Sequence, residues 1–226
     1  MKGFMDNLER RDRQMLYVSD DAVFQEQFPA RRLTFKLNTM DPSDFAGITE
    51  ICRELFPNVE SAFVNPPFHC DYGTHIYAGK NFYMNYNGTI LDVSKVVIGD
   101  NFLAGPNVSI YSASHPMHPA TRNSGFELGL DVMIGDNVWV GGNTVICAGV
   151  TIGSNVVIGA GSVVTRDIPD WSFAAGNPCR VIRPITEADR EYYGHGQQID
   201  AEAMKQIRAL WAEHPGDLRF PTAPKE

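Results

Sequence analysis

Two histidines, His115 and His118, lie three residues apart in the segment SASHPMHP, residues 112–119. Histidine is the side chain whose ordinary pKa lets it take up and release a proton near neutral pH. The pair can therefore be metal ligands, one of them can be a catalytic base, or both can be ordinary loop residues. The residue pattern around the segment decides between these alternatives.

A metal site is the first alternative. Zinc is held by three or four protein ligands, and His115 and His118 lack an obvious third ligand. His69 and His75 are six residues apart, which places them on different faces of one coil of the repeat described below. We therefore expect no bound metal. The four cysteines, which show no CxxC spacing and are expected to be reduced, are Cys52, Cys70, Cys147 and Cys179.

The segment from Ile134 onward repeats every six residues. Written in sixes it reads IGDNVW, VGGNTV, ICAGVT, IGSNVV, IGAGSV and VTRDIP, so each block opens with Ile or Val. This period is typical of a triangular parallel β-helix, in which three blocks close one coil and the aliphatic residues stack about 4.8 Å apart inside it. Isolated β-hairpins would instead alternate with a period of two.

The same register continues on the other side of an interruption. Ile110 and Ile134 are 24 residues apart, a whole number of sixes. We expect the chain to leave the coil over 111–133 and to resume the repeat in phase. Further upstream, Ile76 and Phe82 are expected to continue the register. Loops of this length are usually functional, and the two histidines lie at the start of this one.

The two ends of the chain differ from the repeat over 61–185. Residues 1–60 carry helix signals, with Pro42 near the start of one predicted helix. The apolar face of this helix is expected to hold Phe45, Ile48, Cys52 and Leu55. Residues 186–226 are expected to form a short amphipathic helix followed by a Pro-rich tail. The apolar residues of this second helix are Met204, Ile207, Leu210 and Trp211. Both ends are expected to cap the solenoid, which cannot leave its end coils bare.

The composition is that of an ordinary globular protein, with 43% hydrophobic and 20% charged residues and a formal net charge of −8. Because an acidic chain gains no counterion-release binding, we expect no nucleic-acid partner. Neither the pattern of a secretory signal nor an apolar run long enough to cross a membrane is visible. We therefore expect a cytoplasmic protein without a membrane partner.

Three segments carry motifs that a repeat alone does not require. They are NPPFHCDYGTHIYAGKNFYMNYN, GDNFLAGPNVSIYSASHPMH and the stretch from GDNVWVGGNTV to AAGNPCRVIR. Together they resemble the galactoside, maltose and nodulation-type sugar O-acetyltransferases, densely over residues 62–185. The resemblance implies a mainly β fold, a left-handed parallel β-helix of hexapeptide repeats with an N-terminal helical region and a C-terminal helical extension. It also implies acetyl-CoA as co-substrate and a homotrimer with sites between subunits.

The resemblance implies that His115 is the general base, which removes the proton from a sugar hydroxyl as that oxygen attacks the acetyl thioester. From the residues alone, a loop histidine bonded to backbone stays open, and His118 receives no role. Glu127, in GFELG, would orient the His115 ring and stabilise its protonated form, or it is a solvated loop residue. No covalent acetyl-enzyme is expected, because no cysteine lies in a motif typical of an activated nucleophile.

The resemblance also implies a set of acceptor-binding residues. They are Asp20, Asp71, Tyr83, Asn85 and Asp92. The Asn85 amide both donates and accepts, which suits a hydroxyl group, and the tyrosine ring would cover the sugar. Asp71 and Asp92 would accept hydrogen bonds from the sugar, or they form turns at the coil corners. In the segment LYVSDD, either Asp20 or Asp21 supplies a further carboxylate.

Coenzyme A requires a narrow groove for its pantetheine arm and cations for its phosphates. The residues that the resemblance implies for this role are Trp139, Gly142, Ala160, Thr165, Arg166, Arg180 and Arg183. Small groove residues expose backbone groups to the arm, and guanidinium groups bind phosphate in a bidentate way. A backbone N–H near Gly142 suits a tetrahedral oxyanion. Trp139 either lies near the pantetheine or is surface packing.

Differences from the galactoside branch leave the acceptor open. That branch has Ser where this chain has Asp71 and Gly142, and Lys where it has Arg166, which favours the maltose and nodulation-type branch. The predicted function is acetyl-CoA-dependent O-acetylation of a sugar or glycoside. Two alternatives remain: the same donor with a non-sugar acceptor (an antibiotic, an amino acid or a pathway metabolite), and a catalytically silent β-helix scaffold.

Overall fold

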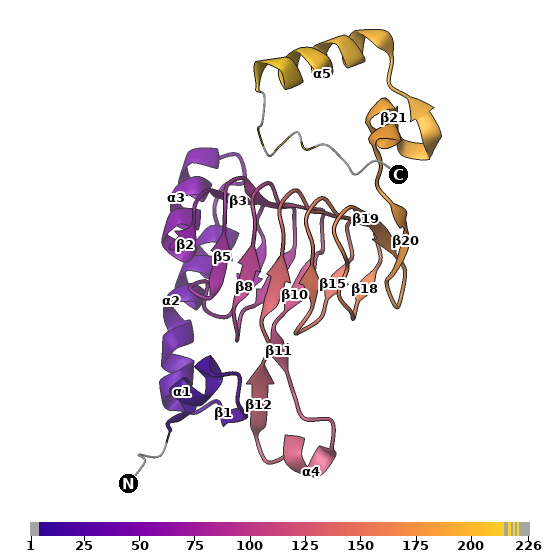
Figure 1. Ribbon diagram of the computed structural model, residues 1–226. Helices are drawn as coiled ribbons and strands as arrows, with labels where there is room; N and C mark the ends of the chain where they lie inside the picture. Colours follow the sequence, from indigo (N-terminus) through magenta and orange to yellow (C-terminus); the bar gives the residue numbers. More distant parts are fainter. Residues whose placement is uncertain (1–4, 215–216, 218, 220, 222–226) are drawn as a thin grey trace.

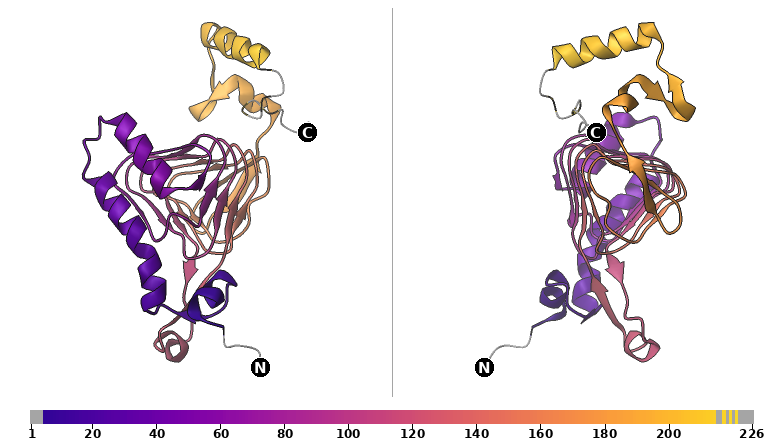
Figure 2. Two further views of the ribbon diagram at one scale, coloured as in Figure 1. Left: turned by 90° about the vertical axis from the view of Figure 1, so that its left-hand side faces the viewer. Right: turned by 45° about the vertical axis from the view of Figure 1, so that its right-hand side comes forward.

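The computed structural model describes residues 5–214, 217, 219 and 221, so most of the expected Pro-rich tail lies outside the described residues. The centre of the molecule is a prism of three sheets whose strands wind around one axis (Figure 1). Figure 2 shows the coils as nested triangles. The predicted β-helix with helical elements at both ends is confirmed.

Each face of the prism is one sheet. Face 1 contains β2 (Asn58–Val59), β5 (Ile76–Ala78), β8 (Val96–Ile98), β13 (Val132–Ile134) and β16 (Thr151–Ile152). Face 2 contains β3 (Ala62–Val64), β6 (Phe82–Met84), β9 (Leu103–Ala104), β14 (Trp139–Val140), β17 (Val157–Ile158), β19 (Ser172–Ala175) and the antiparallel β20 (Arg180–Pro184). Face 3 contains β4 (Phe68–Cys70), β7 (Gly88–Leu91), β10 (Ser109–Tyr111), β15 (Val145–Ile146) and β18 (Val163–Val164). The chain visits the faces in the order 1, 2, 3, so it turns at three corners, 1–2, 2–3 and 3–1.

The predicted register is confirmed on both sides of the interruption. After it, Ile134 pairs with Ile152 and Ile146 pairs with Val164, eighteen residues on. Across it, the coil before the excursion stacks directly on the coil after it, so that Ile110 pairs with Ile146. The inward side chains of this stack are fully buried. The excursion therefore leaves the ladder of face 3 intact.

The expectation that Ile76 and Phe82 continue this register is wrong. Ala78 stands opposite Ile98, and Met84 stands opposite Ala104, twenty residues on. The physical reason is a longer 3–1 corner after β7, which shifts the earlier coils by two residues. Because the shift is even, Ile76 and Phe82 still point inward, and both are buried.

The 1–2 corner is built from a ladder of asparagines. Asn81, Asn101, Asn137 and Asn155 all have left-handed backbone, with φ between 55° and 61°. Asparagine tolerates this conformation better than other residues with a side chain. Each Nδ2 donates to the Oδ1 of the next asparagine at 2.8–2.9 Å. The residue that makes the turn thus also ties neighbouring coils together.

Three helices belong to the N-terminal region: α1 (Asn7–Asp12), α2 (Asp21–Asn38) and α3 (Phe45–Leu55). Figure 1 shows α2 and α3 covering the N-terminal end of the prism. The side chain of Asp44 caps α3 by accepting from the Gly47 N–H at 2.9 Å. Phe45 does not lie on the buried face as expected. It is 63% exposed because it is the first helical residue, and its ring contacts that of Phe63.

The C-terminal extension leaves the prism after β20 and turns back along its side, over face 2 (Figure 1). It contains η1 (Glu187–Glu191), β21 (Tyr192–Tyr193), η2 (Gly194–Gly196), β22 (Gln197–Gln198) and α5 (Ala201–Glu213). The predicted second helix is therefore confirmed, with Asp200 as its N-cap and Met204 buried. None of the helices in the described part of the chain has the length and apolarity that crossing a membrane requires.

The stacking of inward residues predicts a contrast between two neighbours on β16. Ile152 is 1% exposed, whereas the side chain of Thr151 lies on the outer surface. We expect Ile152→Ala to lower the free energy of unfolding by about 2–5 kcal/mol, because it leaves a cavity in the stack. Thr151→Ala should change it by less than about 0.5 kcal/mol. Urea unfolding followed by circular dichroism measures both, and equal losses would contradict the inward stack as the source of stability.

Candidate active site

The excursion between β10 and β13 is built on two antiparallel strands. These are β11 (Ala113–Ser114) and β12 (Phe126–Gly129), joined by a segment that contains the short helix α4 (Pro119–Arg122). The strand β1 (Tyr17–Val18) pairs with the other edge of β12. A small sheet with the order β1, β12, β11 therefore projects from the 3–1 corner (Figure 1).

His115 is the residue that follows β11. The ladder pairs Ala113 with Gly129 and Ser114 with Leu128, so His115 and Glu127 are the next residues on the two sides of the end of this ladder. The His115 side chain is exposed, and it forms no hydrogen bond with the described residues. His118 has a different place, because its Nδ1 accepts from the Ala120 N–H at 3.2 Å and caps α4. The structure thus separates the two histidines: His115 has no hydrogen-bond partner among the described residues, whereas His118 is a helix cap.

Glu127 is held from the side of β1. The hydroxyl of Ser19 donates to Glu127 Oε1. Tyr17 pairs with Glu127 in the ladder and is buried. Burial raises the pKa of the Tyr17 phenol, and the negative charge of Glu127 raises it further. Ser19 was not among the predicted site residues, although it directly precedes Asp20 in the segment that the sequence singled out.

Asp20 serves as the N-cap of α2. Its carboxylate accepts from the Val23 N–H at 3.1 Å and from Asn7 Nδ2 at 2.8 Å. The bond from Asn7 is the main cause that lowers the Asp20 pKa. Asp20 remains exposed, while Asp21 is the first residue of α2 and is exposed as well. The two oxygens of the Asp20 carboxylate thus each accept one hydrogen bond within the chain.

Asp92 lies at the longer 3–1 corner. It is fully buried, and its Oδ1 accepts from the backbone N–H groups of Asp71 and Tyr72, both at 2.9 Å. Its Oδ2 has no hydrogen-bond partner among the described residues. Burial raises the pKa of Asp92. Its carboxylate therefore shapes the backbone that carries Asp71.

Asp71 is half-buried beside this carboxylate. Its pKa is raised to about 6, first by burial, then by the charge of Asp92 and to a smaller extent by that of Glu127. The positive charge of Arg31 on α2 acts in the opposite direction. Sequence reasoning did not include Arg31, because nothing in a helical arginine indicates which corner it faces. Asp71 thus titrates within the range in which histidine titrates.

The predicted polar residues are divided between two corners. Asp71, Asp92 and His115 lie at the 3–1 corner, as do Thr165 and Arg166 after β18. The residues at the 2–3 corner are Asn85, Gly142 and Ala160, which follow β6, β14 and β17. One whole face of the prism, face 3, separates these two groups. A single chain therefore does not bring them together.

The 2–3 corner is tightly stacked. A Cβ placed on Gly141 would lie 2.5 Å from the backbone nitrogen of Ala160 on the next coil, so glycine is required there. Nearby, Asn85 Oδ1 accepts from the Tyr86 N–H at 2.7 Å, which leaves its NH₂ group available as a donor. The hydroxyl of Tyr83 accepts from Asn65 Nδ2 at 2.7 Å, and its ring stacks on Phe63. Tyr83 is thus part of an aromatic surface on face 2.

Trp139 lies on face 2, with 52% of its surface exposed. It borders a cavity of about 460 Å³ between this face and the C-terminal extension. The other lining residues include Val157, Phe173, Arg183, Asp189, Tyr192 and Tyr193. Arg183 Nη1 and Nη2 donate to the two Asp189 carboxylate oxygens at 2.9 and 2.7 Å, which lowers the pKa of Asp189. The predicted phosphate-binding guanidinium is thus bound to a carboxylate of the extension.

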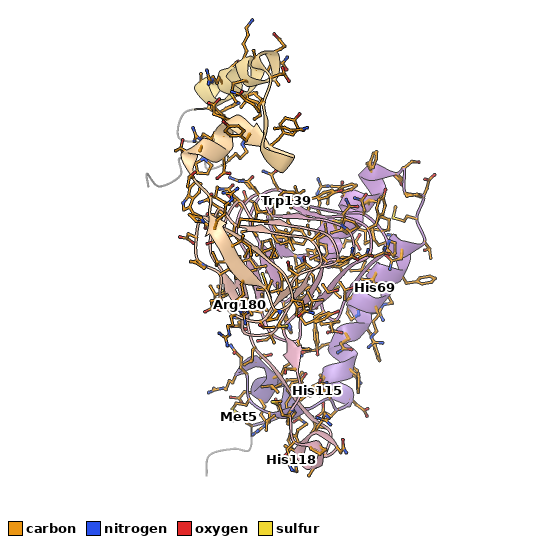
Figure 3. All side chains as sticks on the ribbon, turned by 90° about the vertical axis from the view of Figure 1, so that its right-hand side faces the viewer. Met5, His69, His115, His118, Trp139 and Arg180 are labelled. Carbon is orange, nitrogen blue, oxygen red and sulfur yellow. The ribbon has the colours of Figure 1, made fainter. Side chains whose placement is uncertain are left out.

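The remaining predicted cations are less constrained. Arg180 Nη1 donates to the neighbouring Cys179 carbonyl at 2.7 Å, and its side chain is exposed. Arg166 is exposed and has no hydrogen bond to the described residues. Figure 3 shows Trp139 and His115 on opposite sides of the prism, with Arg180 between their levels. The residues predicted to bind the donor therefore do not converge on one place in this chain.

No group of three or more potential metal ligands comes together within the described residues. His69 is in β4 on face 3, whereas His75 directly precedes β5 on face 1, as their spacing predicted. His75 Nδ1 lies 2.7 Å from the carbonyl oxygen of Asp92, and its ring stacks on that of Tyr72. His75 thus supports the corner that carries Asp71.

Comparison with known proteins identifies the family. The description of the matching family model is "Bacterial transferase hexapeptide (six repeats)", and it matches residues 131–166. Galactoside O-acetyltransferase of Escherichia coli is 43% identical over 178 residues, which are 78% of this chain and 88% of that protein. A maltose O-acetyltransferase structure from Clostridium difficile has 44% identity and a TM-score of 0.79, covering 82% of this chain and all of the other. A galactoside acetyltransferase structure in complex with coenzyme A has 39% identity and a TM-score of 0.83. The match covers 88% of this chain and 100% of the other chain.

These matches are extensive enough to assign the protein to a family. The chain belongs to the hexapeptide-repeat acetyltransferases, and its prism is their left-handed parallel β-helix. The resemblance seen in the sequence is thereby confirmed, and the protein is an acetyl-CoA-dependent acetyltransferase.

The raised pKa of Asp71 predicts a pH-dependent stability difference. Its ordinary pKa is 3.8 and its pKa in the folded protein is about 6, so deprotonation destabilises the fold as the pH rises from about 4 to 6. The free energy of unfolding of Asp71→Asn relative to the unmodified protein should therefore increase over this range and stay constant above it. Urea unfolding at pH 4, 5, 6 and 7 measures this difference.

Asp41 provides a matched control for that experiment. The Ser43 N–H donates to its carboxylate and lowers its pKa. Both its folded and its ordinary pKa lie at or below about 3.8, so Asp41→Asn should show a nearly constant stability difference between pH 4 and 7. The same pH trend in both variants would show that Asp71 does not titrate as the corner geometry predicts.

Proposed function

We propose that the protein transfers the acetyl group of acetyl-CoA to a hydroxyl group of a sugar or glycoside. The observation that carries the proposal is the position of His115. Its side chain is exposed and unpaired within the described chain, and it lies at the end of the β11–β12 ladder, where Glu127 is the next residue of β12. The names of the similar proteins, galactoside and maltose O-acetyltransferases, support a sugar as the acceptor.

In this proposal His115 is the general base. It removes the proton of the acceptor hydroxyl while the oxygen attacks the carbonyl carbon of the thioester. The tetrahedral intermediate then expels the thiolate of coenzyme A, which takes the proton from the imidazolium. The carboxylate of Glu127 orients the ring and stabilises the imidazolium. The half-buried Asp71 and the free NH₂ group of Asn85 support binding of the acceptor hydroxyl groups.

The donor binds along face 2 and the 2–3 corner of one subunit and the 3–1 corner of its neighbour, where Thr165 and Arg166 lie. The similar structure that contains coenzyme A supports this role, and the tight stacking of small residues at the 2–3 corner leaves room for a pantetheine arm. A backbone N–H there stabilises the oxyanion. Arg166 and Arg180 are exposed cations for the phosphates, whereas Arg183 must exchange Asp189 for a phosphate if it takes part.

The complete site forms between subunits of a homotrimer. This is supported by the division of the predicted residues between the 2–3 and 3–1 corners, which a single chain keeps on opposite edges of face 3. A cyclic trimer places one corner of each subunit against the other corner of its neighbour, so that three equal sites arise.

The acceptor class can be tested directly. Purified protein with acetyl-CoA should release thiol in the presence of galactosides, maltose or glucosamine oligomers, and mass spectrometry should show an O-acetylated sugar. A panel of serine, chloramphenicol and other non-sugar hydroxyl compounds serves as the comparison. Turnover with these compounds alone would replace the sugar by a non-sugar acceptor, and no detectable binding of coenzyme A by calorimetry would favour a silent scaffold.

The shared site predicts complementation between two inactive variants. His115→Ala removes the base and should lower kcat by roughly 10²-fold or more, and Asn85→Ala should weaken acceptor binding at the other corner. When the two variants are coexpressed in equal amounts, mixed trimers contain one intact site each, so about a quarter of the unmodified activity should return. The doubly substituted chain coexpressed with His115→Ala is the control. A mixture that is no more active than the better variant would contradict a site between subunits.

A further inference from the structure

Ser19 connects the N-terminal region to the candidate base. We propose that Ser19 is a positioning residue of the acetyl transfer, whose hydroxyl holds the carboxylate of Glu127 in place opposite His115. The inference rests on the proposed role of His115 and extends it to a residue that does not touch the substrate. The direct observation is the hydrogen bond from the Ser19 hydroxyl to Glu127 Oε1.

The backbone of Ser19 is fixed on both sides. Before it, the Val18 N–H donates to Asn7 Oδ1 at 3.1 Å. After it, Asp20 caps α2 and also accepts from Asn7 Nδ2. Ser19 thus sits between a paired strand and the first turn of a long helix. Its hydroxyl therefore occupies a defined position relative to Glu127, as a positioning group requires.

The strand that carries Ser19 is itself anchored in a core. Tyr17 is 1% exposed and packs with Val23, Tyr72 and Val93 in a cluster separate from the interior of the prism. Tyr17 and Val18 pair with Glu127 and Phe126 on β12. β12 in turn pairs with β11, which leads into His115. The chain of contacts from the buried cluster to the base is thus continuous through backbone hydrogen bonds.

Glu127 lies among other titratable side chains. Tyr17 from β1 and Asp71 from the 3–1 corner each interact electrostatically with Glu127, and the Asp71 charge is unfavourable to a second carboxylate. Arg31 acts on Asp71, and the charge of Arg11 acts on Tyr17. The Ser19 hydroxyl is a neutral donor that satisfies Oε1. Oε2 accepts no hydrogen bond from the described residues, which leaves it for the imidazole.

The experiment compares Ser19→Ala with two other serine variants. Ser19→Ala should lower kcat roughly tenfold at unchanged KM for acetyl-CoA, because Glu127 no longer holds the ring in its productive orientation. Ser19→Thr keeps the hydroxyl and should restore most of the activity. Ser124→Ala is the matched control, since the Ser124 hydroxyl is in the same excursion and donates to the Ala120 carbonyl. It should leave kcat unchanged.

Two further measurements separate positioning from a merely structural role. The acid limb of the kcat/KM profile reports the protonation of the base. It should move to lower pH in Ser19→Ala and further in Glu127→Gln, because an imidazolium with a weaker carboxylate partner is less stable. In the Glu127→Gln background, Ser19→Ala should have no additional effect on kcat. An unmoved acid limb, or additive losses in the double variant, would overturn the proposal.

The outcome also distinguishes this inference from the proposed function. If His115→Ala keeps its turnover, the assignment of the base fails and the role of Ser19 fails with it. If His115→Ala is inactive while Ser19→Ala has the kcat and the pH profile of the unmodified protein, the proposal for Ser19 alone is wrong. A lowered melting temperature of Ser19→Ala with unchanged kcat leads to the same conclusion.

Discussion

Every coil of the prism is held by contacts between its inward aliphatic side chains and those of the next coil, about 4.8 Å away. Ile110, Ile146 and Val164 form one such stack, and all three are fully buried. The spacing fixes the period of six, the small residues at the corners and the parallel direction of the ladders. A long irregular segment must therefore leave the coil, as the excursion before β13 does, whereas two extra residues fit within a corner.

This constraint determines where chemistry is possible. The interior of the prism is filled with aliphatic and aromatic side chains, so polar groups gather on its corners and outer faces. The 3–1 corner carries Asp71 and His115, and the 2–3 corner carries Asn85. A rigid prism cannot fold these corners onto each other. The proposed site between subunits follows from this constraint, and the excursion is the part of the chain that carries His115.

Much of the fold followed from the sequence, because stacking imposes a period that can be read directly from Ile98 to Val164. The register of the coils upstream of Ile98 could not be predicted in this way. Two extra residues at the corner that contains Asp92 shift these coils without breaking the inward pattern. The site was less predictable. The spacing of His115 and Glu127 does not reveal that both lie at the end of one short ladder. No motif marks Ser19, whose bond to Glu127 depends on pairing between strands more than a hundred residues apart.

The direct pairing of Ile110 with Ile146 has an evolutionary consequence. Because the coils on either side of the excursion stack as if it were absent, insertions and deletions within it do not disturb the register of the solenoid. The part that carries His115 can therefore diverge in length and shape at little cost to folding. A lineage built on this prism can vary one loop and its neighbouring strand, while the scaffold remains the same.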